Sequence, residues 1–307
     1  MIDLHLHLDG SLDKDFVIKE YREQETELPC PEKDFGKLLQ SKSAKSLKEY
    51  LRAFKYPLKI LQTERAMTAA YKSLLDKLDK CGIVYAEIRF APQLHTKKGL
   101  SQQAVVEAVL NARKYADNIV ENNVILCCMR GDGNEKENIE TIELAKAYKS
   151  IGVVGVDLAG DEKSYPTVDY KDIFKRAVAY DIPITIHAGE AVGVESVKAA
   201  LDIGARRIGH GVMIKDDDEL LKRIAKDGIG IEMCFTSNTD TGALKDKKDF
   251  PIHKYLDFGI LASVNTDDMT VSDTTIDKEF ESLKSLGVNE ADKRKLISNA
   301  FETRFGR

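Results

Sequence analysis

Residues 1–10 read Met-Ile-Asp-Leu-His-Leu-His-Leu-Asp-Gly, so apolar and polar side chains alternate until a glycine ends the pattern. A period of two is that of a β-strand, in which successive side chains point to opposite faces. One face therefore carries the apolar residues, and the other carries Asp3, His5, His7 and Asp9. The two imidazoles share a face, roughly 7 Å apart along the strand. This spacing suits a single metal ion.

Seven further apolar, β-branched runs of strand length follow, and a helix-like segment separates each run from the next. They cover residues 83–90, 124–129, 153–158, 183–187, 206–210, 229–234 and 260–265. Strands that alternate with helices are expected to pair in parallel. Eight such units in 307 residues, with no Pro/Gly-rich linker, favour one (β/α)₈ TIM barrel domain over residues 1–307 rather than an open doubly wound sheet.

Extra helices are expected between the first and second strands, up to about residue 80. One apolar helix face there is formed by four residues at i, i+3, i+4 and i+7, namely Leu47, Tyr50, Leu51 and Phe54. Residues 101–122 carry Ala and Val on one side and are predicted to be helical. Residues 216–227 begin with acidic residues, which suit a helix N-terminus.

The composition restricts the partners of the protein. The formal net charge is −5, and basic and acidic residues are interspersed rather than in blocks. We therefore expect a small-molecule substrate, with neither nucleic acid nor a membrane as partner. Five cysteines occur without any Cys-x-x-Cys pair, and no apolar run reaches the ~20 residues that span a bilayer. With no basic leader before the first strand, these features predict a cytoplasmic protein.

Polar residues follow the predicted strands at their C-terminal ends, where the catalytic residues of a barrel lie. His187-Ala-Gly-Glu190 leaves the fifth strand, and its glycine lets the chain turn and bring a carboxylate over the same cavity. Gly209-His210-Gly211 closes the sixth strand, and Asn265-Thr-Asp-Asp268 closes the eighth. His95 and His253 do not share this placement, so we expect them on the surface or in loops.

The eighth strand neighbours the first once the barrel closes, so one of its acids can complete a metal site with the histidines. Three imidazoles and a carboxylate form a ligand set that zinc favours, with an open position for water. We expect one Zn²⁺ per chain, although another divalent transition metal would also bind. Such an ion lowers the pKa of water from ~15.7 towards ~7. Residues 153–160 contain no lysine to bridge a second metal.

Six motifs stand at the ends of these strands or within them. They are His-x-His-Leu-Asp-Gly-Ser at 5–11, Ala-Glu-Ile-Arg-Phe at 86–90, Asp-Leu-Ala-Gly-Asp-Glu at 157–162, His-Ala-Gly-Glu at 187–190, Gly-His-Gly at 209–211 and Asn-Thr-Asp-Asp at 265–268. In combination they resemble the adenosine deaminase family of the metal-dependent amidohydrolase superfamily. The resemblance runs from the first motif through at least the last, which is most of the chain.

The resemblance implies a role for each residue. The implied metal ligands are His5, His7, His187 and Asp267. The implied catalytic residues are Glu190, which protonates the purine N1, His210, which orients and helps deprotonate the attacking water, and Asp267. The implied substrate-binding residues are His7, Asp9 at a ribose hydroxyl, Gly160 at N3 and Asp268 at N7. The apolar face at residues 47–54 corresponds in the family to a helix that gates the pocket.

The implied reaction is hydrolytic deamination of adenosine and 2′-deoxyadenosine to inosine or deoxyinosine and ammonia, by attack of water activated on zinc at C6. The acid must stay protonated near neutral pH, and burial raises the pKa of a carboxyl in that direction. Relatives that act on adenine tend to carry Glu at the position of Asp9, which favours a nucleoside.

Alternative readings stay open at this point. One is a deaminase of a related purine, such as adenine or a modified adenosine, and another is a different mononuclear amidohydrolase. The cytidine-deaminase type is excluded because its His-x-Glu and Pro-Cys-x-x-Cys signature is absent. A barrel that only binds nucleosides or a partner protein should have lost ligands or the acid, and all are present. The sequence leaves the oligomeric state open.

Overall fold

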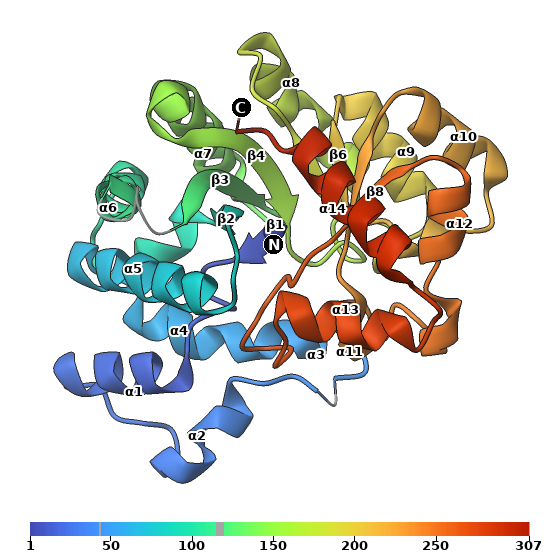
Figure 1. The fold of residues 1–307 in the computed structure, drawn as a ribbon. Helices are drawn as coiled ribbons and strands as arrows, with labels where there is room; N and C mark the ends of the chain where they lie inside the picture. Colours follow the sequence, from blue (N-terminus) through green and yellow to red (C-terminus); the bar gives the residue numbers. More distant parts are fainter. Residues whose placement is uncertain (43, 115–119, 307) are drawn as a thin grey trace.

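Eight strands form the centre of the molecule in a computed structural model, which describes residues 1–42, 44–114 and 120–306, and helices surround them (Figure 1). The strands are β1 (Ile2–His7), β2 (Tyr85–Phe90), β3 (Glu121–Met129), β4 (Val153–Ala159), β5 (Thr185–Ala188), β6 (Arg207–His210), β7 (Gly230–Met233) and β8 (Leu261–Val264). Each strand overlaps one of the eight predicted runs. The predicted alternation of strands and helices is confirmed.

The strands pair in parallel and in chain order, as β1-β2-β3-β4 and β5-β6-β7-β8. Two bridges join these halves into a closed barrel. Val156 pairs with Ile184 between β4 and the approach to β5, and Leu6 pairs with Asp267 between β1 and the end of β8. At the second bridge the backbone N–H of His7 donates to the carbonyl of Asp267 at 2.8 Å. The closure therefore brings the last strand directly against the first.

The helices separate and follow the strands. Between β1 and β2 lie α1 (Lys14–Glu23), α2 (Glu32–Leu38), α3 (Leu47–Tyr50), η1 (Leu51–Phe54), α4 (Lys55–Ile60) and α5 (Glu64–Lys80). The remaining helices are η2 (Pro92–His95), α6 (Gln102–Lys114), α7 (Glu135–Tyr148), η3 (Lys149–Ile151), η4 (Thr167–Tyr170), α8 (Lys171–Ala179), α9 (Val194–Ile203), η5 (Val212–Ile214), α10 (Asp218–Lys226), α11 (Phe235–Asp240), η6 (Lys247–Asp249), α12 (Ile252–Asp257), α13 (Ile276–Lys284) and α14 (Glu290–Thr303). Within the described ranges, no helix has both the length and the apolarity to cross a bilayer.

Two of the predicted helices have different limits in the structure. The helix predicted over 216–227 is α10, which begins where the Asp217 side chain accepts a hydrogen bond from the backbone N–H of Leu220. The helix predicted over 101–122 is wrong at its C-terminal end. Its helical part is α6, residues 115–119 lie outside the described residues, and Asn122 already belongs to β3. Asn has low strand propensity, so pairing with β2, not local sequence, extends this strand.

The inner and outer faces of β1 follow the predicted alternation. Leu4, Leu6 and Leu8 are fully buried on the outer face, where helices cover the barrel (Figure 1). His5 is also fully buried, on the inner face. A strand of this kind is buried on both sides, so every polar group on its inner face needs a partner inside the barrel.

Candidate active site

A cavity opens at the C-terminal ends of the strands. Its apolar wall is the face predicted at residues 47–54, which the structure divides between α3 and η1 and which Leu58 of α4 extends. Its polar floor is formed by seven residues: His7, Asp9, His187, Glu190, His210, Asp267 and Asp268. Gly160, just after β4, also lines the cavity and has a φ of +107°, a backbone conformation that favours glycine.

Three imidazoles and one carboxylate meet at one point of this floor. One ligand atom each from His5, His7, His187 and Asp267 lies within 4.8 Å of all the others. Nε2 of His7 is 3.2 Å from Nε2 of His187 and 3.4 Å from Oδ1 of Asp267, and the same oxygen is 3.2 Å from Nε2 of His5. Among the described residues, this buried Nε2 of His5 has no hydrogen-bond partner.

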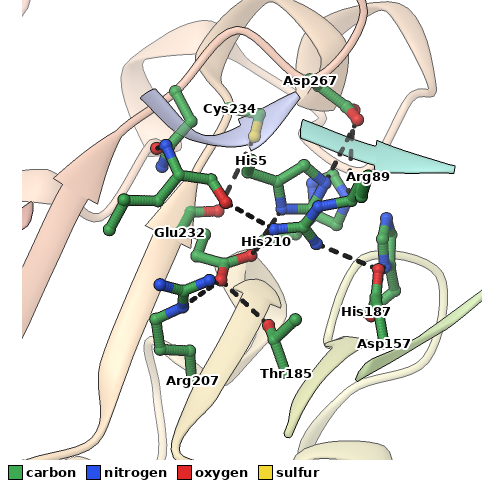
Figure 2. A network of polar contacts seen from close by, with 12 residues as sticks. His5, Arg89, Asp157, Thr185, His187, Arg207, His210, Glu232, Cys234 and Asp267 are labelled. Carbon is green, nitrogen blue, oxygen red and sulfur yellow. Dashed lines mark hydrogen bonds and ion pairs between the residues drawn. The ribbon is translucent and has the colours of Figure 1, made fainter. Parts of the chain in front are cut away.

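Carboxylates behind the cluster fix two of the three histidine rings. Nδ1 of His5 is 2.7 Å from Glu232, and Nδ1 of His187 is 3.0 Å from Asp157, so both rings turn Nε2 towards the cluster (Figure 2). A carboxylate at the second ring nitrogen is the usual support of a metal-binding histidine, because it sets the tautomer and the ring orientation. The donor set and its supports therefore fit a divalent metal ion.

The charges around the cluster also fit a cation. Ion pairs join three buried carboxylates, those of Glu87, Asp157 and Glu232, to the guanidinium groups of Arg89 and Arg207. Asp267 is linked to this network through His5, which contacts both Glu232 and Asp267 (Figure 2). Four negative and two positive charges leave a formal charge of −2 when the imidazoles are neutral. Burial and Arg89 act to lower the pKa of His5, but Asp267 and Glu232 raise it to about 9. The network thus attracts positive charge, as a divalent metal would supply.

His210 and Glu190 face each other beside this cluster. Nε2 of His210 lies 3.7 Å from Oε2 of Glu190 and 4.0 Å from Oδ2 of Asp267, and the Asn238 side chain holds Nδ1 at 3.0 Å. His210 and Asp267 both have left-handed backbone conformations, with φ of 66° and 60°. Few residues other than glycine adopt this conformation, and strained backbone of this kind tends to cluster at active sites.

Three carboxyl groups in the cavity, those of Glu190, Asp9 and Asp268, have raised pKa values. Burial, with the nearby charges of Asp267 and Glu162, raises the pKa of Glu190 to about 8. Burial alone raises the pKa of Asp9 to about 6, and burial together with Asp267 raises the pKa of Asp268 well above its usual range. Glu190 is therefore a carboxylic acid at neutral pH and can donate a proton.

The structure brings together every residue that the sequence singled out for the site, except that His5 lies behind the cavity wall rather than on it. The surface placement of His253 agrees with its exposure. The prediction for His95 is wrong: this residue is fully buried in η2, and its Nδ1 lies 2.8 Å from the carbonyl of Leu61. Packing against the ring of Phe90 explains the burial.

The sequence did not identify several residues as supports of the site, although Arg89, Glu162 and Tyr50 lie in segments that it singled out. These supporting residues are Arg89, Glu162, Arg207, Glu232, Asn238 and Tyr50, whose hydroxyl donates to Oδ2 of Asp268 at 2.9 Å. A signal was available for Arg89 and Glu232, because each is a charged residue inside a run of strand length. A charge in a strand that is buried on both faces requires a paired partner.

A closed parallel barrel with histidines and carboxylates at its strand ends places the protein among the metal-dependent hydrolases of the amidohydrolase type. The chain belongs to the adenosine deaminase family, because the family model described as adenosine deaminase matches residues 1–306. It is therefore a hydrolytic deaminase.

Individual relatives agree with this assignment. The chain is 41% identical to an adenosine deaminase of Haemophilus ducreyi over 316 aligned residues, which cover 99% of this chain and 91% of that protein. It is 38% identical to an adenosine deaminase of Enterococcus faecalis, over 92% of this chain and 84% of that one. The crystal structure of an adenine deaminase from Arthrobacter aurescens has a TM-score of 0.91 at 25% identity, covering 100% of this chain and 94% of that chain.

Proposed function

We propose that this enzyme hydrolyses adenosine and 2′-deoxyadenosine to inosine and deoxyinosine with release of ammonia, as a step of purine salvage in the cytoplasm. The observation that carries the proposal is Glu190, a buried carboxylic acid with a pKa near 8 that faces His210 next to a cluster of metal-ligand type. The relatives named adenosine deaminase support the choice of substrate.

We infer that one Zn²⁺ per chain is held by His5, His7, His187 and Asp267. Imidazole nitrogens with one carboxylate oxygen are a common zinc donor set, and such a site accepts other divalent transition metals too. When bound, the ion supplies Lewis acidity, which allows water to act as a nucleophile near neutral pH.

Glu190 and His210 carry out the proton transfers of the reaction. Protonation of N1 by Glu190 draws electrons from the ring and makes C6 electrophilic, which a neutral aromatic C6 is not. His210 lies between Glu190 and Asp267, so its Nε2 can orient the water and take a proton from it. Addition of the water oxygen at C6 and departure of the amino group as ammonia then give the 6-oxopurine.

Substrate orientation falls to groups around the cavity. Asp268, kept neutral, can donate a hydrogen bond to N7, and the backbone N–H of Gly160 can donate to N3. Asp9 holds a ribose hydroxyl, and His7 borders the purine at the cluster. The apolar wall of α3, η1 and α4 would cover the base and exclude water, which strengthens each polar contact inside.

The assignment is tested by mixing metal-loaded protein with adenosine, deoxyadenosine, adenine and adenosine monophosphate and following the loss of purine absorbance. We expect the two nucleosides to be converted far faster than the other compounds. Conversion of none of them would reject the deaminase function. Preference for adenine would support the alternative suggested by the Arthrobacter aurescens adenine deaminase. Metal analysis of the same preparation tests the single zinc.

The rate should fall as the pH rises through the pKa of Glu190. The acid works only when protonated, and burial raises its pKa to about 8, so kcat/KM should decrease tenfold per unit well above about pH 8. Initial rates with adenosine, with metal content measured at each pH, check this expectation. A rate that stays constant up to about pH 9.5 would contradict the protonated form of Glu190 as the acid.

Replacing Asp9 with glutamate should shift the preference from nucleoside towards free base. Asp9 is buried at the cavity, and one added methylene moves its carboxyl into the space of the ribose. We expect kcat/KM for adenosine relative to adenine to fall by about 10- to 100-fold. Asp13→Glu makes the same change at an exposed neighbouring position and should leave the ratio unaltered. An unchanged ratio in Asp9→Glu would exclude Asp9 from ribose recognition.

A further inference from the structure

The turn that carries Glu190 encloses a buried carboxylate from another strand. Glu162, which follows β4 and is almost fully buried, accepts hydrogen bonds from four consecutive backbone N–H groups. Its Oε1 accepts from Gly189 at 2.7 Å, and its Oε2 accepts from Glu190 at 3.2 Å, Ala191 at 2.6 Å and Val192 at 3.0 Å. Successive N–H groups of this kind form a concave anion site, and here the protein fills it with its own side chain.

Arg130 holds the other end of the same turn. Its buried guanidinium donates from Nη2 to the carbonyl of His187 at 2.7 Å, and from Nη1 to the carbonyl of Tyr165 at 2.7 Å. Gly189 lies between the part of the turn held by Arg130 and the part held by Glu162. Its φ is +77°, and a Cβ there would come within 3.1 Å of the Gly211 backbone. The backbone from His187 to Val192 is therefore fixed from both sides, and Glu162 and Arg130 carry opposite charges.

Glu162 takes no direct part in the proposed reaction. Its carboxylate is directed at backbone N–H groups, and it is not among the residues that line the cavity of the proposed reaction. A buried charged side chain is costly unless it is fully hydrogen-bonded, so its presence under this turn needs a reason. Within residues 189–192, whose N–H groups Glu162 accepts from, the side chain that lines the cavity is that of Glu190.

We propose that Glu162 is a positioning residue for the proton donor: through the four N–H groups of residues 189–192, it fixes the Glu190 carboxyl opposite His210. The inference rests on the proposed function, because it takes Glu190 to be the acid of the deaminase. Proton transfer in the transition state depends on the placement of the donor within fractions of an ångström. Loss of the hydrogen bonds between Glu162 and residues 189–192 therefore lowers kcat more than it weakens substrate binding.

The charge of Glu162 has a second effect on Glu190. Besides Glu162, the polar groups around the Glu190 carboxyl include Asp267, Asp268 and His5, the side chain of Thr241, and Nε2 of His210. Negative charges disfavour the ionised form of Glu190, so removing the charge of Glu162 lowers the pKa of Glu190. The pH at which activity is lost then falls as well.

The test compares Glu162→Gln with wild type and with Asp161→Asn, which removes an equal charge at the adjacent residue. Glutamine keeps the size of Glu162 but offers one acceptor oxygen to four donors and turns an NH₂ group towards the others. In Glu162→Gln we expect hydrogen–deuterium exchange at residues 189–192 to accelerate by about tenfold or more. We expect kcat to fall about 10- to 100-fold and KM to change less than about threefold. The basic limb of the pH–rate profile, where activity is lost as the pH rises, should move down by about 0.5 pH unit or more.

Asp161→Asn should match wild type in all four measurements. Unchanged exchange and kcat in Glu162→Gln would overturn the proposal, and so would a loss of activity that only follows a loss of bound metal. If Glu162→Gln is insoluble, Glu162→Asp replaces it: the shorter side chain keeps the charge, so exchange and kcat should change while the basic limb stays in place. Wild-type exchange and kcat in Glu162→Asp would likewise overturn the proposal. If wild-type protein fails to deaminate adenosine, the proposed function falls, but the exchange data still decide whether Glu162 holds the turn.

Discussion

Replacing Glu190 with glutamine should lower kcat for adenosine by about 10²- to 10⁴-fold, because a general acid contributes a factor of that size. Glutamine has nearly the same shape and can still donate a hydrogen bond to N1, but it cannot transfer a proton. Substrate binding should therefore change little, so the loss should appear in kcat rather than in KM. Steady-state rates and metal analysis of the purified variant measure both effects.

Metal retention separates this result from a damaged site. Glu190 is not one of the four clustered ligands, so Glu190→Gln should bind metal as wild type does. Glu195→Gln, an exposed substitution in the first turn of α9, is the matched control and should keep wild-type activity. A Glu190→Gln enzyme with a near-normal rate would mean that another group protonates the purine.

Replacing Glu232 with glutamine should destabilise the protein by about 3–5 kcal/mol, the usual effect of breaking a buried ion pair by removing one partner. Glu232 is fully buried, and its two oxygens contact Arg89 at 2.9 Å, Arg207 at 2.6 Å and Nδ1 of His5 at 2.7 Å. A single amide oxygen cannot serve all three groups, and two guanidinium charges lose their shared partner. His5 also loses its orienting contact, so metal affinity should fall.

Urea unfolding of metal-free protein measures the stability, and dialysis against a chelator measures the metal affinity. Glu219→Gln removes an exposed carboxylate from α10 and should change neither. Wild-type stability and metal affinity in Glu232→Gln would show that the network relaxes without Glu232. Loss of metal affinity without loss of stability would mean that Glu232 acts on His5 alone.

Local sequence was sufficient for the barrel and for the ends of its strands. The alternation in residues 1–10 shows both faces of β1, and the β-branched runs mark the other seven strands because such residues pack well on a pleated, buried surface. Histidines and acids then fall at one end of the barrel because parallel strands all point the same way. This reasoning needs no knowledge of which side chains touch.

The supporting contacts were beyond such reasoning because their partners are far apart in the chain. Arg89 and Glu232 are separated by 143 residues, and nothing near either one names the other. Glu162 accepts hydrogen bonds from backbone N–H groups 27 to 30 residues away. Because every residue except proline has a backbone N–H, the sequence does not mark these partners. The burial of His95 likewise depends on Phe90 and Leu61 in three dimensions. The periodicity of the sequence identifies the faces of a strand or helix, but it does not identify which side chains contact one another.

The buried network of Arg89, Arg207, Glu87 and Glu232 also limits how the sequence can change. Arg89 and Glu87 lie on β2, Arg207 lies on β6 and Glu232 lies on β7. Ion pairs connect the three strands, and all four side chains are buried. A substitution that alters one charge is tolerated only with a compensating change on another strand, so these positions should vary together among homologues. Redesign of the barrel interior therefore has to exchange whole groups of residues across strands, whereas the apolar wall of the cavity can be altered one residue at a time.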